Sequence, residues 1–107
     1  MEDTVEVTVG VVDGGIGVDF STMYIREHWR FIQEMLIAGG FKRPREVWFV
    51  RNRGNLVDWN KLRIDSEQCS YWHLDPRIAC DQITAWLSNL QPSQFGFQFR
   101  VTTPSNA

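Results

Sequence analysis

Few side chains in this sequence have the chemistry of a catalytic centre. There are two histidines, His28 and His73, and two cysteines, Cys69 and Cys80. A nucleophile and its base must lie within hydrogen-bonding reach of each other, whereas four extended residues separate Cys69 from His73 by about 13 Å. No catalytic motif selects any of the four. We therefore predict no catalytic residue, and we interpret both cysteines as reduced, packed thiols.

A glycine-rich stretch at residues 12–19 reads Val-Asp-Gly-Gly-Ile-Gly-Val-Asp. Backbone N–H groups ahead of a helix can hold a phosphate, but the stretch lacks both the P-loop Lys-Ser/Thr pair and the Gly-x-Gly-x-x-Gly spacing. Asp13 and Asp19 supply fewer oxygen ligands than Mg²⁺ or Ca²⁺ requires. We expect no metal and no cofactor, and a small ligand-binding or enzymatic role for residues 13–19 is a third hypothesis.

Charge is segregated along the chain. Residues 1–20 contain no Lys or Arg and form an acidic patch of five residues, Glu2, Asp3, Glu6, Asp13 and Asp19. Residues 42–53 are basic, and tryptophans occur among and after them. Because aromatic and arginine side chains dominate protein interfaces, we predict that a partner-binding surface is formed by Arg43, Arg45, Trp48, Arg51, Arg53 and Trp59.

These features favour a non-catalytic protein-binding module. Its composition is comparable to that of small intracellular inhibitors, toxin-immunity proteins and phage-encoded anti-defence proteins, which occlude a surface of their partner. The alternative is binding of RNA or single-stranded nucleic acid by residues 42–59, with Trp48 or Trp59 stacking on a base. A net charge of −2 and a pI near 5.6 argue against that alternative. A homodimer is compatible with every hypothesis.

The length and composition are those of a globular protein. A chain of 107 residues with 43% hydrophobic and 22% charged residues suits a single domain, residues 1–107. No apolar run approaches the roughly 20 residues that span a bilayer. The N-terminus is acidic and has no apolar core, so we expect no signal peptide, no membrane association and a cytoplasmic location.

Two helices are predicted. Apolar residues recur at helical spacing in residues 21–40, where Ser21 or Thr22 is the expected N-cap and Gly39-Gly40 the expected end. A second helix is expected from Pro76 to about Asn89, because Asp is a preferred N-cap and Pro a preferred first helical residue.

Strands are predicted where apolar residues alternate with polar ones. Residues 4–12 and 16–20 form either a β-hairpin with an Asp-Gly turn or one strand followed by a glycine-rich loop. Further strands are expected at residues 46–51, 61–65, 69–74 and 95–102. The resulting fold class is α+β, with an antiparallel sheet of four to six strands and two helices packed on one face. The best-fitting order is a ferredoxin-like βαββαβ arrangement with an extra N-terminal hairpin.

Overall fold

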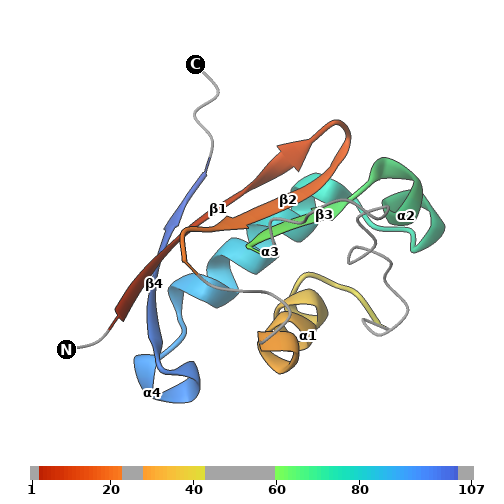
Figure 1. The fold of residues 1–107 in the computed structure, drawn as a ribbon. Coiled ribbons are helices and arrows are strands. Elements are labelled where there is room, and N and C mark those ends of the chain that lie inside the picture. Colours follow the sequence, from red (N-terminus) through yellow and green to blue (C-terminus); the bar gives the residue numbers. More distant parts are fainter. Residues whose placement is uncertain (1–2, 23–27, 43–59, 104–107) are drawn as a thin grey trace.

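A computed structural model of the chain describes residues 3–22, 28–42 and 60–103, and residues 1–2, 23–27, 43–59 and 104–107 lie outside the described part. Figure 1 shows the arrangement of the elements. In chain order they are β1 (Asp3–Val12), β2 (Gly15–Phe20), α1 (Trp29–Ala38), β3 (Lys61–Ile64), α2 (Ser66–Tyr71), α3 (Pro76–Ser88), α4 (Pro92–Phe95) and β4 (Phe97–Thr102). Within the described residues, no helix is long and apolar enough to cross a membrane.

The first two strands form the hairpin that the Asp-Gly pair predicts. β1 and β2 pair antiparallel, with Val12 opposite Gly15 next to the turn. Asp13 and Gly14 both have positive φ angles, 50° and 77°, as the two central residues of a type I′ turn require. The reading of this segment as one strand and a glycine-rich loop is therefore wrong.

The sheet is mixed, so the prediction of an all-antiparallel sheet is wrong. Its four described strands lie in the order β3-β2-β1-β4. β2 pairs antiparallel with both β1 and β3, whereas β1 pairs parallel with β4. The ferredoxin-like order is not found among the described elements, because β1 lies between its own hairpin partner and the last strand.

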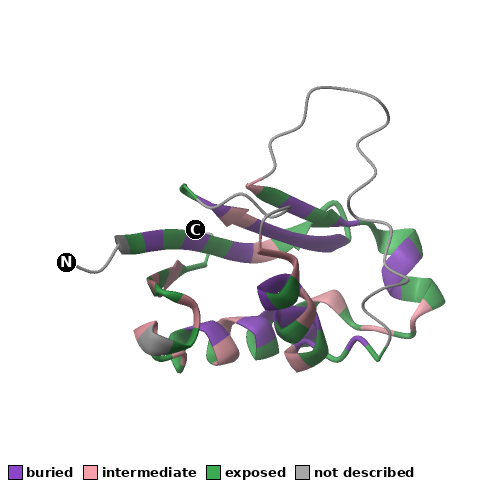
Figure 2. Cartoon of the chain, turned by 60° about the horizontal axis from the view of Figure 1, so that its bottom comes forward, coloured by how far each residue is buried: buried purple, intermediate pink, exposed green. Residues whose placement is uncertain are grey.

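Among the described residues, helices cover one face of the sheet and leave the other open (Figure 2). Alternate strand residues point to the covered face, where α1, α3 and α4 lie. The buried apolar side chains of the sheet are Val5, Val7, Val9, Ile16, Val18, Phe20, Leu62 and Ile64. They pack against apolar residues of the two longer helices, Phe31, Ile32, Met35, Leu36, Ala79, Cys80, Ile83 and Leu87. The α+β class and the one-sided helix packing are as predicted.

The described part of the first helix is shorter than predicted. α1 begins at Trp29 with His28 at the N-cap position, and no side chain caps it. The proposed cap Ser21 lies elsewhere, because its Oγ accepts a hydrogen bond of 2.9 Å from the Glu6 N–H. The predicted end is confirmed, since the helix stops at Ala38 and Gly40 has a φ angle of 103°.

The strand predicted at residues 69–74 is wrong, because residues 66–71 form the short helix α2. The Asp65 carboxylate accepts a hydrogen bond of 2.8 Å from the Gln68 N–H and caps the first turn. The alternation of Tyr71, Trp72, His73 and Leu74 resembles that of a strand, but the polar residues that precede it in the chain form the start of a helix.

The C-terminal third follows its sequence signals closely. α3 begins at Pro76, and the Asp75 carboxylate accepts a hydrogen bond of 2.9 Å from the Arg77 N–H. Phe97, Phe99 and Val101 of β4 pack on the core, and the residues between them are exposed. One difference is that Phe95, predicted as the first residue of this strand, is the last residue of α4.

Candidate functional site

The predicted partner-binding surface cannot be compared with the structure. Its six residues, Arg43, Arg45, Trp48, Arg51, Arg53 and Trp59, all lie outside the described residues. Of the basic segment only Lys42 is described, and it is exposed. In the acidic patch, Glu2 lies outside as well, and Asp3 is described only by its place in β1. The role assigned to these residues stays a prediction.

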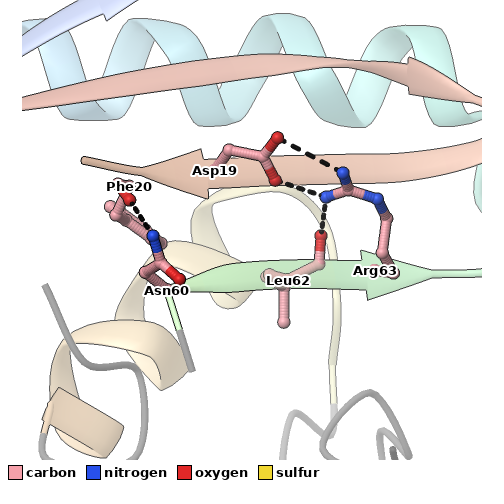
Figure 3. A network of polar contacts seen from close by, with 5 residues as sticks. All are labelled: Asp19, Phe20, Asn60, Leu62 and Arg63. Atoms are coloured by element: carbon pink, nitrogen blue, oxygen red, sulfur yellow. Dashed lines mark hydrogen bonds and ion pairs between the residues drawn. The ribbon is translucent and has the colours of Figure 1, made fainter. Parts of the chain in front are cut away.

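Asp19 of the acidic patch forms an ion pair on the open face of the sheet (Figure 3). The Arg63 guanidinium on β3 donates through Nη1 to Asp19 Oδ1 and through Nη2 to Asp19 Oδ2, the latter over 3.2 Å. Nη1 also donates to the Leu62 carbonyl at 2.9 Å. Since both carboxylate oxygens are engaged, Asp19 is not a free anionic group.

Glu6 is also paired with an arginine of a neighbouring strand. Arg100 Nη1 of β4 lies 3.4 Å from Glu6 Oε1, and both side chains are largely exposed. Thr8 and Thr102 form the next cross-strand contact, with their hydroxyl oxygens 3.2 Å apart. The open face therefore carries charges that largely neutralise each other, and the acidic patch is divided between this face and Asp13 in the hairpin turn.

The two thiols are buried and free. Burial raises the pKa of the Cys69 thiol, and the nearby Asp65 carboxylate raises it further. Burial likewise raises the pKa of Cys80 to about 11, with smaller contributions from Asp81 and Cys69. Because the thiolate is the reactive form, both groups are poor nucleophiles at neutral pH.

The two histidines have different surroundings from the two buried thiols. The His28 ring packs edge-on against Phe97, with centroids 5.2 Å apart. His73 is exposed and has a φ angle of 56° in the turn after α2. Across residues 3–22, 28–42 and 60–103, no group of three or more His, Cys, Asp or Glu side chains could hold a metal ion.

The described residues contain one unpaired stretch of strand edge beside a groove. β1 is ten residues long, but its pairing with the six-residue β4 runs only from Asp3 opposite Phe97 to Thr8 opposite Thr102. The last residues of β1, Val9 to Val12, extend beyond β4 toward the hairpin turn (Figure 1). On this side the described residues supply no further strand.

The direction of the backbone groups on this edge follows from the hairpin. The Ser21 N–H donates to the Glu6 carbonyl at 2.8 Å, so even-numbered residues of β1 direct their N–H and C=O toward β2. Since this direction alternates along a strand, Val11 directs its N–H and C=O to the opposite edge. The Val11 side chain, which is 50% exposed, lies on the same face as buried Val5, Val7 and Val9.

This edge forms one wall of a groove of about 940 Å³. The other lining residues come from α3 and its cap Asp75, and from Thr103, which directly follows β4. The residues that line the groove are Val9, Gly10, Val11, Gly14, Asp75, Pro76, Arg77, Cys80, Asp81, Thr84 and Thr103. A strand edge facing a helix across a groove can accept an extended polypeptide by adding it to the sheet.

Sequence reasoning missed this groove. The alternation of residues predicts each strand and its buried face, but it does not predict that β4 lies beside β1 or where their pairing stops. Pro104 was the available signal, because it directly follows Thr103 and has no N–H with which to extend the ladder along β1.

Comparisons with protein-family models, curated proteins and solved structures found no match to this chain.

Proposed function

We propose that this chain is a non-catalytic protein-binding module that binds its partner at the groove between the β1 edge and α3. The observation that carries the proposal is the unpaired edge of β1 beyond Thr8. An unpaired strand edge pairs readily with another polypeptide, and natural proteins usually cover or blunt it. Here the edge contains no charged side chain and no proline, and it faces a groove large enough for a chain segment.

The groove's residue types favour binding over catalysis. The described residues that line it include no histidine and no lysine, and the one thiol among them, Cys80, is protonated at neutral pH because its pKa is raised to about 11. Asp75 is occupied as the helix cap. Backbone groups of the β1 edge supply affinity in such an arrangement, and side-chain contacts in the groove supply selectivity.

Nucleic-acid binding is the second hypothesis from the sequence. It depends on residues 42–59, of which only Lys42 is described, and so it stays a prediction without structural support. The described strands place no aromatic side chain on the open face for stacking, since Phe97 and Phe99 of β4 pack on the core side.

A partner capture with matched variants tests the proposal. Val11→Pro removes the N–H that faces the groove without removing a hydrogen bond of the hairpin, because that N–H points away from β2. Val11→Ala retains the N–H and shortens only the side chain on the groove wall, so it is the control for the loss of that side chain. We expect the tagged chain and Val11→Ala to recover the same protein partner, and folded Val11→Pro to lose it.

A second variant keeps the test valid if Val11→Pro does not fold. Thr84→Tyr fills the groove from the α3 wall and should also abolish capture. Recovery of the partner by both variants, or recovery of nucleic acid alone, would overturn the proposal. The Trp48→Ala/Trp59→Ala double variant, run beside them, reports whether the sequence-derived surface contributes to binding.

A further inference from the structure

The groove has room for a short extended segment. The unpaired edge runs from Val9 to Val12, which corresponds to about 13 Å at the rise of a β-strand. A segment of about four residues can therefore lie along β1, in line with β4 and in the position that a longer β4 would occupy. Alternate side chains of such a segment would enter the groove, because successive residues of a strand point to opposite faces.

The groove's inner surface and its rim differ in chemistry. Val9 and Val11 lie on the β1 wall, and the small, buried Cys80 lies on the α3 wall. The charged residues of the lining are Asp75, which caps α3, and Arg77 and Asp81 of the helix itself. The charged groups that line the groove are thus two carboxylates and one guanidinium.

The carboxylate of Asp81 is the one left available. Asp75 accepts the Arg77 N–H as the cap of α3. Among the described residues, no ion pair within 4.0 Å engages Asp81, although Arg77 lies four positions earlier on the same helix. Asp81 is exposed at the groove's edge. A cation that enters the groove beside Asp81 would find a carboxylate that no described basic group engages, and an anion placed beside Asp81 would be repelled.

We propose that the groove binds an extended protein segment that carries a lysine or arginine, with this cation placed against Asp81. The inference rests on the proposed function and adds the chemistry of the partner's segment. It combines two independent features: the β1 edge fixes the segment's backbone, and the excess of carboxylates on the rim selects the charge of its side chain.

Fluorescence anisotropy of labelled peptides tests the inference on the full chain. The probes are three fluorescein-labelled pentapeptides, Thr-Val-Xaa-Val-Thr, in which Xaa is Lys, Gln or Glu. We expect the Lys peptide to bind about two- to fivefold more tightly than the Glu peptide at low salt, the effect of one exposed ion pair. Asp81→Asn should reduce this ratio toward one, and Val11→Pro should abolish the binding of all three peptides.

Each contrary result has a distinct meaning. Equal binding of the three peptides, tighter binding of the Glu peptide, or no binding of any would overturn the inference, while partner capture sensitive to Val11→Pro would still uphold the proposed function. Peptide binding that persists in Val11→Pro would overturn both. If the Lys peptide binds to a variant that ends at Thr103 but not to the full chain, the chain's own tail occupies the groove and the inference is wrong.

Discussion

Arg63 on β3 holds Asp19 on β2 through two parallel hydrogen bonds, and it also donates to the carbonyl of Leu62 next to it in the chain. The pair joins adjacent strands on the open face of the sheet. It fixes the guanidinium beside Gly17, where a β-carbon would come within 3.2 Å of Arg63 Nη1. The acidic N-terminal segment thus pairs with an arginine of an edge strand.

We expect this pair to stabilise the fold only modestly. The two side chains are 45% and 38% exposed, so a double-mutant cycle with Asp19→Ala and Arg63→Ala should give a coupling free energy below about 1 kcal/mol that declines with added salt. The Glu6–Arg100 pair has one contact of 3.4 Å and more exposed side chains, and its coupling should be smaller. Chemical denaturation measures both cycles, and the reverse order would contradict the structure.

Gly15 should tolerate no side chain. A β-carbon there would lie 2.1 Å from the Ile64 carbonyl oxygen, and this oxygen belongs to the backbone of β3, which cannot move without separating from β2. Gly15→Ala should therefore lower the free energy of unfolding by more than about 3 kcal/mol, beyond most point substitutions.

Gly96→Ala is the matched control for Gly15→Ala. Gly96 has a φ angle of 80° and no heavy atom within 4 Å of an added β-carbon. Only the backbone cost of about 1–2 kcal/mol applies there. Equal losses for the two variants, measured by urea denaturation, would show that the close approach of β2 and β3 at Gly15 is wrong.

Much of the fold could be predicted because its local signals are strong. The Asp13-Gly14 turn, the alternating valines of β1 and the Asp75-Pro76 start of α3 each determine their conformation within a few residues. α2 was missed because its capping residue Asp65 was assigned to the preceding strand, and the aromatic residues 71–72 then resembled a new one.

The neighbours in the sheet could not be predicted in the same way. β1 and β4 are paired across more than 90 residues of sequence, for example Thr8 with Thr102. Alternation shows which face of a strand is buried but not which strand lies beside it. For this reason the arginine partners of Glu6 and Asp19, and the unpaired edge at Val11, emerged only from the structure.

The buried thiols should make stability fall in alkaline solution. The folded protein raises the pKa of Cys80 from 9.0 to about 11 and shifts that of Cys69 in the same direction, so folding favours the protonated thiols. The contribution of Cys80 is fully present below pH 9 and is lost as the pH rises through about 11, and that of Cys69 changes in the same direction. For Cys80 it is on the order of 2 kcal/mol.

Denaturation curves at pH 8 and pH 11 measure this loss. Cys69→Ala/Cys80→Ala removes both groups, so its free energy of unfolding should fall less between the two pH values than that of the parent chain. All other ionisable groups are the same in both proteins and cancel in the comparison. An equal decline in the two proteins would show that the thiols are not the groups responsible.

Phe31 should be among the most sensitive core positions. Its ring stacks on Phe99 with centroids 5.0 Å apart and planes 9° apart, and it also contacts Phe20, Trp86 and Phe95. It therefore joins α1 to β2, α3, α4 and β4 at one point. Phe31→Ala should cost about 3–5 kcal/mol, because it leaves a cavity where four aromatic rings converge.

The matched control on the same helix is Ile37→Ala, since Ile37 is 58% exposed and its loss should change stability by no more than about 0.5 kcal/mol. Guanidinium denaturation followed by near-ultraviolet circular dichroism measures both variants and reports the ring packing directly. If Phe31→Ala cost no more than Ile37→Ala, α1 would not be packed against β4 as described. The groove variants would then have to be interpreted on a different arrangement of helices.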